Sequence, residues 1–151
     1  MCTAGSLDRV QMVKGWVNAD GSLGEKVYDI AWSGDRKMDE NGKIPSVGNS
    51  VNIEDATWSN DIGAAELSKV WTDPSFDSSQ ESFYYVRVIE IPTPRWTLYD
   101  KVKYGAELGP EIPITTTEIQ TMKHLNTQDT IFINFKRHKS NAKELTATHY
   151  Y

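Results

Sequence analysis

The chain has 151 residues, a length that suits one globular domain with a hydrophobic core of its own. Its net charge of −5 argues against nucleic acid as the main partner, because binding to phosphates needs a basic surface. The single cysteine, Cys2, excludes an intrachain disulfide and a metal site built from cysteines, and no run of about 18 apolar residues is present to span a membrane.

The first third of the sequence predicts a β-hairpin. Leu7–Val17 alternates apolar and polar side chains, and Glu25–Ser33 places its aromatic and aliphatic residues on one side. The pair Asp20-Gly21 lies between these runs and is a strong signal for a tight turn. The two runs are therefore expected to pair as antiparallel strands.

The middle of the chain predicts a mixture of elements. Gly34–Gly48 is expected to be a long polar connection, and Ser50–Asn60 a strand or a pair of strands. Ile62–Val70 contains alanines and a leucine, which favour a short helix, and Trp71–Gln80 is expected to be a loop. Glu81–Ile91 has apolar residues on both faces and predicts a central strand covered on both sides.

The remaining elements are less regular. The prolines of Pro92–Trp96 are expected to end the preceding strand, and the glycines and prolines of Thr97–Pro113 predict irregular structure. Thr116–Leu125 is predicted as a helix that begins at a threonine cap, and Thr130–Phe135 as a strand. No structure is assigned to residues 136–151.

These elements predict the fold class and the organisation of the chain. Short strands separated by turns favour a mainly β fold, namely an antiparallel β-sandwich of about seven strands with one or two short helices. Residues 1–6 are expected to be a disordered start, residues 7–114 the β-sandwich domain, and residues 115–151 a divergent tail with one helix and one strand. The tail is basic, with five basic and three acidic side chains, whereas residues 1–114 hold 11 basic and 18 acidic ones.

Several segments in order resemble one known family. They carry the phrases KGW, WSGDR, WTDP and YYVRVIEIPTPRW, and the match covers about residues 7–105. The segments are Leu7–Val17, Glu25–Lys37, Asn41–Val51, Ile62–Asp77 and Phe83–Thr97. Their order and spacing resemble the C-terminal part of the domain of unknown function 3604 family.

The resemblance implies a larger parent protein. Full-length members look like PHP-like, metal-dependent hydrolases, with an upstream domain that holds divalent metals through His and Asp clusters and a β-sandwich downstream of it. The partner implied for this chain is that upstream domain, the cofactor implied is a divalent metal in the missing domain only, and the parent is implied to be exported, periplasmic or secreted. The location of this chain itself is left open, because its first residues lack the apolar segment of a secretory signal.

The chain departs from the family pattern in its tail. The family closes on a Ser-Pro-Ile-Trp-Tyr-like strand, but here Thr115–Thr130 leads into the sequence IFINFKRHKS. Either the tail has diverged or a change of reading frame has replaced it.

Three residues stand out as candidates for a domain interface or the rim of a site. Arg87 lies in the middle of a predicted strand, where a charge needs a carboxylate partner such as Asp29, and the alternative is a contact with the missing domain. Arg95 and Trp96 follow two prolines that hold the backbone extended, which suits a rigid contact loop. The alternative for Trp96 is that it caps the core of the sandwich.

No residue of this chain is predicted to be catalytic, to bind a cofactor or to ligate a metal. The only histidines are His124, His138 and His149; their spacing matches no ligand motif, and they are expected to be exposed. The acidic stretches Asp35–Asn41 and Asp73–Asp77 match calcium loops only in part and are predicted to be polar turns.

The expected function is therefore that of a non-catalytic accessory β-sandwich that docks on a PHP-like metallohydrolase domain of unknown substrate. A free-standing module that binds carbohydrate or protein through Trp58, Trp71 or Trp96 is one alternative. A truncated gene fragment without independent function is another. Self-association through an unpaired sheet edge is left open.

Overall fold

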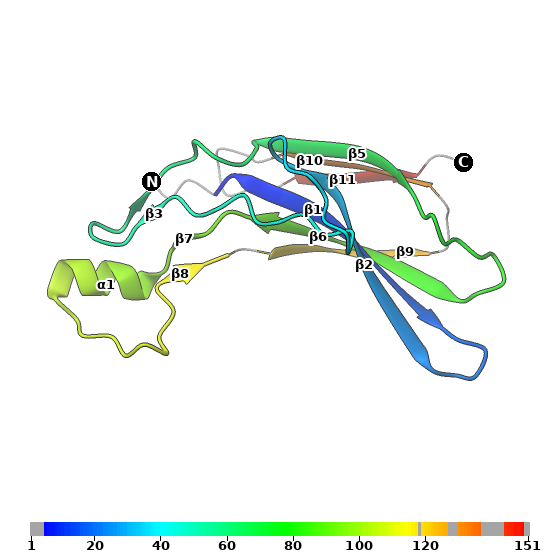
Figure 1. Ribbon diagram of the computed structural model, residues 1–151, viewed down its shortest axis with the longest axis horizontal. Helices are drawn as coiled ribbons and strands as arrows, with labels where there is room; N and C mark the ends of the chain where they lie inside the picture. Colours follow the sequence, from blue (N-terminus) through cyan, green and yellow to red (C-terminus); the bar gives the residue numbers. More distant parts are fainter. Residues whose placement is uncertain (1–4, 118, 127–129, 137–143, 150–151) are drawn as a thin grey trace.

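The computed structural model describes residues 5–117, 119–126, 130–136 and 144–149, in which strands dominate and one helix is present. A four-stranded sheet has the order β2-β1-β6-β9, and a three-stranded sheet has the order β11-β10-β5 (Figure 1). All strand pairs in both sheets are antiparallel. The strands are β1 (Leu7–Val17), β2 (Leu23–Trp32), β5 (Glu66–Thr72), β6 (Ser82–Glu90), β9 (Ile119–Asn126), β10 (Thr130–Lys136) and β11 (Glu144–His149).

Two short strand pairs and the helix lie outside these sheets. The pair of β3 (Val51–Asn52) and β4 (Thr57–Trp58) closes one loop, and β7 (Thr93–Pro94) pairs with β8 (Thr115–Thr116). The helix α1 (Trp96–Tyr104) follows β7. Figure 1 shows α1 and the turn between β1 and β2 at opposite ends of the molecule.

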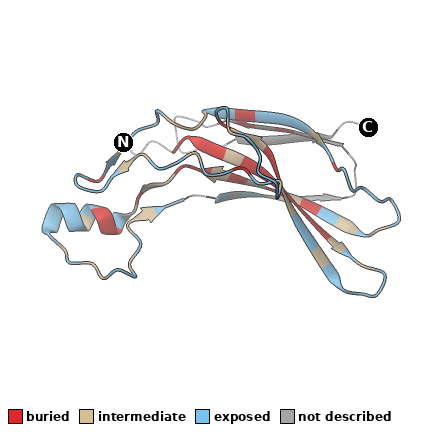
Figure 2. Ribbon diagram, in the orientation of Figure 1, coloured by how far each residue is buried: buried red, intermediate tan, exposed pale blue. Residues whose placement is uncertain are grey.

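The hydrophobic core lies between the two larger sheets. Buried apolar side chains of β1, β2 and β6 contact those of β5 and β10, and Figure 2 shows the buried segments of β1 and β6 at the centre of the molecule. Burying each large apolar side chain contributes about 1.5–3 kcal/mol to folding. The cluster consists of Leu7, Val10, Met12, Ile30, Leu67, Tyr84, Val86, Val88, Ile133 and Phe135.

The predicted fold class is confirmed. The protein is mainly β, its sheets are antiparallel, and the two larger sheets together hold seven strands. The predicted hairpin is present as β1 and β2, and its turn places Gly21 at φ +82°, a conformation that glycine adopts without strain. The predicted strand pair in Ser50–Asn60 is present as β3 and β4.

Both helix predictions are wrong. Most of Ile62–Val70 belongs to β5, because Leu67 enters the core opposite Phe135 of β10 and this pairing overrides local helix propensity. Most of Thr116–Leu125 belongs to β9, which pairs with β6 along its length. Conversely, the predicted irregular segment Thr97–Pro113 contains most of α1, which ends where Gly105 adopts a left-handed conformation at φ 66°.

The described residues near the two ends of the chain take part in the fold. Gly5 and Ser6 are buried, and the carbonyl of Ser6 accepts a hydrogen bond from the amide of Ile91. Residues 1–4 lie outside the described part. In the tail, Glu144–His149 forms β11, although no structure was predicted there.

β6 lies between β1 and β9, as expected of a central strand, but only one of its faces is fully covered. Tyr84, Val86 and Val88 are buried against the three-stranded sheet, whereas Tyr85 and Arg87 on the other face are half-exposed. None of the described helical segments is long and apolar enough to cross a membrane.

Candidate functional site

The two faces of the four-stranded sheet carry different side chains. Residues that oppose each other in the register share a face, so Met12 and Lys14 lie with Val86 and Tyr84 on the face toward the core. Gly15 and Phe83 share the opposite face, and so do Gln11 and Arg87. We call the first the inner face and the second the outer face.

The inner face contains a buried ion pair. The Lys14 ammonium lies 2.6 Å from a carboxylate oxygen of Asp73, and both side chains are almost fully buried. The Tyr84 hydroxyl donates to the same oxygen at 2.7 Å, and Lys14 also donates to the Ser75 carbonyl at 2.8 Å. The Ser75 amide donates to the second Asp73 oxygen at 2.9 Å, so the carboxylate is bonded on both sides.

These contacts shift the ionisation of the group. Burial by itself would raise the pKa of Asp73, but hydrogen bonds from Lys14, Ser75 and Tyr84 outweigh it and lower this pKa to about 2. Burial opposes the charge on Lys14, yet the hydrogen bond to Asp73 leaves its pKa above the ordinary 10.5. Burial and the bond to Asp73 raise the pKa of Tyr84, which keeps its proton to donate. Lys14, Asp73 and Tyr84 therefore use their hydrogen-bonding groups on one another and on Ser75, which is the arrangement of a structural network and not of a ligand site.

The polar connection after β2 covers one half of the outer face. The amide of Ile44 donates to Asp29 at 2.8 Å, and the Ile44 side chain is buried. Asp29 also accepts from the side-chain amide of Gln11 at 2.7 Å and lies 3.6 Å from the guanidinium of Arg9. Asp29 is thus occupied by neighbours on β1, and the predicted ion pair between Asp29 and Arg87 is wrong.

Arg36 fixes this connection to the sheet. It is the arginine of the WSGDR phrase, and its guanidinium donates to the Asp8 carboxylate at 2.5 Å, to the Asp8 carbonyl at 2.7 Å and to the Pro45 carbonyl at 2.6 Å. Its Nε donates to the Ser33 carbonyl at 2.9 Å. A single planar guanidinium therefore joins the start of β1, the end of β2 and the loop beyond, which explains the arginine in structural terms.

The other half of the outer face is apolar and partly exposed, although Val13 of β1 is fully buried within it. Phe83 and Tyr85 stack with ring centroids 6.4 Å apart, and the Arg87 guanidinium lies 5.7 Å from the centre of the Tyr85 ring. Among the described side chains Arg87 has no acidic partner, and its buried Nε has no hydrogen-bond acceptor. The open surface consists of Val17, Leu23, Phe83, Tyr85, Arg87, Ile89 and Ile119, and we call it the outer sheet patch.

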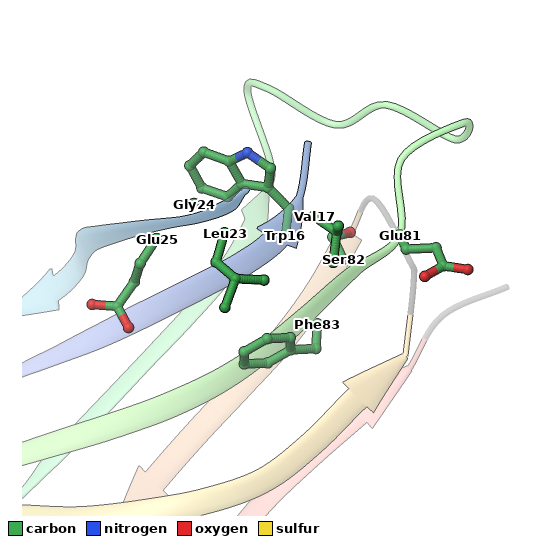
Figure 3. Close-up of a pocket in the computed structure, with 9 residues that line it drawn as sticks. Trp16, Val17, Leu23, Gly24, Glu25, Glu81, Ser82 and Phe83 are labelled. Carbon is green, nitrogen blue, oxygen red and sulfur yellow. The ribbon is translucent and has the colours of Figure 1, made fainter. Parts of the chain in front are cut away.

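A pocket of about 390 Å³ lies at one end of the outer sheet patch. Figure 3 shows Leu23 and Phe83 on the same side of the sheet, while Trp16 projects to the other. The absence of a side chain at Gly15 lets the Phe83 ring pack directly on the backbone of β1, because a Cβ atom there would lie 2.3 Å from that ring. Glu25 and Glu81 stand at the edge of the pocket, so the pocket is apolar with an acidic rim.

Arg95 and Trp96 lie on a different part of the molecule. Arg95 is the residue before the first turn of α1, and Trp96 begins the helix with 64% of its surface exposed. The alternative in which Trp96 caps the core is therefore wrong. The structure does not bring Arg87 together with this pair into one site, because Arg87 is in mid-strand on β6, whereas α1 lies between β7 and β8, which form a separate strand pair.

The described residues hold no group of three histidine, cysteine, aspartate or glutamate side chains placed to bind a metal. Three buried carboxylates, those of Asp8, Asp29 and Asp73, do not fit a metal site, because they already accept bonds from arginine, glutamine or lysine side chains. Cys2 and the side chains of His124, His138 and His149 lie outside the described part.

The sequence matches the family model described as protein of unknown function (DUF3604) over residues 2–120. The chain belongs to this family. No curated protein and no solved structure is similar enough to match it. The DUF3604 match extends from the N-terminal segment to the first residues of β9, so it includes Arg87, Arg95, Trp96 and the pocket.

Sequence reasoning missed two features of the site. Lys14 was not singled out, although a lysine among inward-facing β1 residues needs a buried acid and Asp73 was available in the WTDP phrase. The pocket lies where Phe83 packs over Gly15, a pairing that appears only once the register between β1 and β6 is known.

Proposed function

We propose that this DUF3604 chain is a non-catalytic accessory domain that docks through the outer sheet patch on a PHP-like, metal-dependent hydrolase domain of its parent protein. One observation carries the proposal. Arg9, Lys14 and Arg36 have acidic partners, whereas Arg87 has none among the described side chains and lies in a partly exposed apolar surface.

The composition of the patch supports docking. Leu23 is 84% exposed, Phe83 42% and Ile119 52%, which is costly for a surface that faces only water. Tyrosine and arginine are among the residues that contribute most to protein interfaces, and stacking on Tyr85 holds the Arg87 guanidinium in place for a partner carboxylate. The pocket beside Phe83 suits an apolar side chain of the partner.

In this proposal the divalent metal and the reacting groups belong to the upstream domain, and this chain shapes or covers its cleft. The test is to assay the purified chain with manganese, zinc or iron on phosphate and carboxylic esters. We expect no turnover that depends on a side chain of this chain. Turnover that disappears when one of its residues is substituted would contradict the proposal.

Docking is tested by titrating the chain with the upstream region of a full-length family member and measuring association by sedimentation. We expect Leu23→Asp to abolish association and Arg87→Ala to weaken it by about tenfold or more, since central arginines are often hot spots. The matched control is Val70→Asp, because Val70 is also exposed but lies on β5 of the other sheet. Equal effects of the substitutions on the two sheets, or no association at all, would count against the patch.

A further inference from the structure

The helix α1 exposes large aromatic side chains at the end of the molecule opposite to the β1–β2 turn (Figure 1). Trp96 is 64% exposed, Tyr104 70% and Tyr99 41%, although the helix has only nine residues. On a helix with 3.6 residues per turn, Trp96, Tyr99 and Lys103 share one face. The burial of Thr97 and Leu98 shows that the opposite side packs on the protein.

The same helix concentrates positive charge on an acidic protein. Arg95, Lys101 and Lys103 lie within ten residues that include one acid, Asp100, whereas the chain as a whole has a net charge of −5. The Lys103 ammonium lies 5.1 Å from the centre of the Tyr104 ring, so cations and rings alternate on the surface. We call Arg95, Trp96, Tyr99, Lys103 and Tyr104 the α1 surface. Lys101 is exposed, but it lies one turn from Thr97 and Leu98 and not on the face of Trp96 and Tyr99.

The α1 surface is held rigidly. The amide of Arg95 donates to the Ile114 carbonyl at 2.9 Å, and the Thr97 hydroxyl donates to the Pro113 carbonyl at 2.7 Å. At the other end of the helix the amide of Gly105 closes the last turn on Lys101. A surface fixed in this way loses little conformational entropy when a ligand binds.

We propose that the α1 surface binds an acidic polysaccharide, that is, a glycan chain bearing carboxylate or sulfate groups. The faces of Trp96, Tyr99 and Tyr104 can pack on the C–H faces of sugar rings, and the cations Arg95 and Lys103 can pair with the acidic substituents. The surrounding acidic protein repels such a polymer elsewhere, so charge complementarity directs it to this helix.

An anionic membrane fits the α1 surface less well. Insertion into a bilayer requires buried aliphatic area, and Val102 is the only exposed aliphatic side chain of α1. The polysaccharide proposal does not rest on domain docking, because the α1 surface and the outer sheet patch share no residue.

The test is affinity electrophoresis of the full chain in gels that contain heparin, polygalacturonate or neutral dextran. We expect retardation by the two acidic polymers that falls as sodium chloride is added, and none by dextran. Trp96→Ala and the double substitution Arg95→Gln/Lys103→Gln should each weaken the retardation by about tenfold or more. The matched controls are Lys69→Gln, an exposed lysine on β5, and Leu23→Asp in the outer sheet patch, and both should bind like the unsubstituted chain.

Unchanged melting of the Trp96→Ala variant confirms that loss of binding is not loss of folding, as expected for a side chain that is mostly exposed. Four results would overturn the proposal: no retardation by either acidic polymer, equal retardation by dextran, retardation that survives both α1 variants, or tighter binding to phosphatidylserine vesicles than to either polymer. Because Leu23→Asp lowers domain docking but not polymer binding, failure of one proposal is distinguishable from failure of the other.

Discussion

Lys14 and Arg87 are cations on adjacent strands of one sheet, but their surroundings differ completely. Lys14 lies on the inner face, where its ammonium donates to the Asp73 carboxylate and to the Ser75 carbonyl. Tyr84 donates to the same carboxylate. Arg87 lies on the outer face, stacked on Tyr85 with a buried Nε that has no acceptor. The difference shows that a charge in mid-strand can be part of the core on one side of a sheet and part of an open surface on the other.

Removing the cation of the inner face is the strongest way to test this comparison. Lys14→Met leaves the Asp73 charge buried without its partner, so we expect the free energy of unfolding to fall by about 3–5 kcal/mol in a urea titration. The matched control is Arg87→Met, which removes a half-exposed cation and should change stability by less than about 1 kcal/mol. Equal losses in the two variants would show that the two faces do not differ.

The hydrogen bonds of Arg36 provide a test of how the polar connection after β2 is held over the outer face. Arg36→Lys keeps the charge but cannot reach Asp8, Ser33 and Pro45 together, so we expect a loss of about 2–3 kcal/mol in unfolding free energy. The neighbouring exchange Lys37→Arg lies at an exposed position and should be nearly neutral. An Arg36→Lys variant as stable as the unsubstituted chain would mean that other contacts hold the polar connection to the sheet.

Lowering the pH tests how much the ionised Asp73 contributes to stability, without a substitution in the core. Its pKa is lowered from 3.8 to about 2, so the folded state prefers the charged form and gains stability above the unfolded pKa. That contribution, about 2 kcal/mol, is lost as the pH falls from about 4 to about 2. Urea titrations at several pH values should show this loss of unfolding free energy. The Asp73→Asn variant has no carboxylate to protonate, so its unfolding free energy should not show the Asp73 contribution to the loss over the same pH range.

The smallest effect is expected on the outer sheet patch. Leu23 is 84% exposed, so Leu23→Asp should change the free energy of unfolding by no more than about 0.5 kcal/mol. The same substitution should lower the binding of a hydrophobic fluorescent dye, because it removes apolar area beside the pocket. A large loss of stability would place Leu23 in the core and remove it from the docking surface.

The sequence predicted the parts of the fold that depend on local pattern. The alternation in Leu7–Val17 and the turn signal Asp20-Gly21 were sufficient to predict the first hairpin, because two strands joined by a tight turn pair with each other. It failed where distant pairing decides, because Leu67 enters a strand only through its contact with β10. It also missed α1, although Gly105 and the lysines of the last turn are signals for a helix end.

For the candidate site, the sequence suggested Arg87, Arg95 and Trp96 as interface or rim residues, which stays a prediction, and it could not assign their surroundings. The face on which Arg87 lies follows from the strand period, yet the occupation of Asp29 by Gln11 and Ile44 depends on how the polar connection folds back. The exposure of Trp96 likewise depends on α1, a helix that is not among those predicted from the sequence.

We propose that the outer sheet patch is the surface through which this DUF3604 chain docks on the upstream domain of its parent protein. Amide hydrogen exchange of the chain, with and without the upstream region of a full-length family member, tests it directly. We expect added protection in β6 and around the β1–β2 turn, with β5 unchanged. Protection that appears in β5 while β6 exchanges as before would contradict the account.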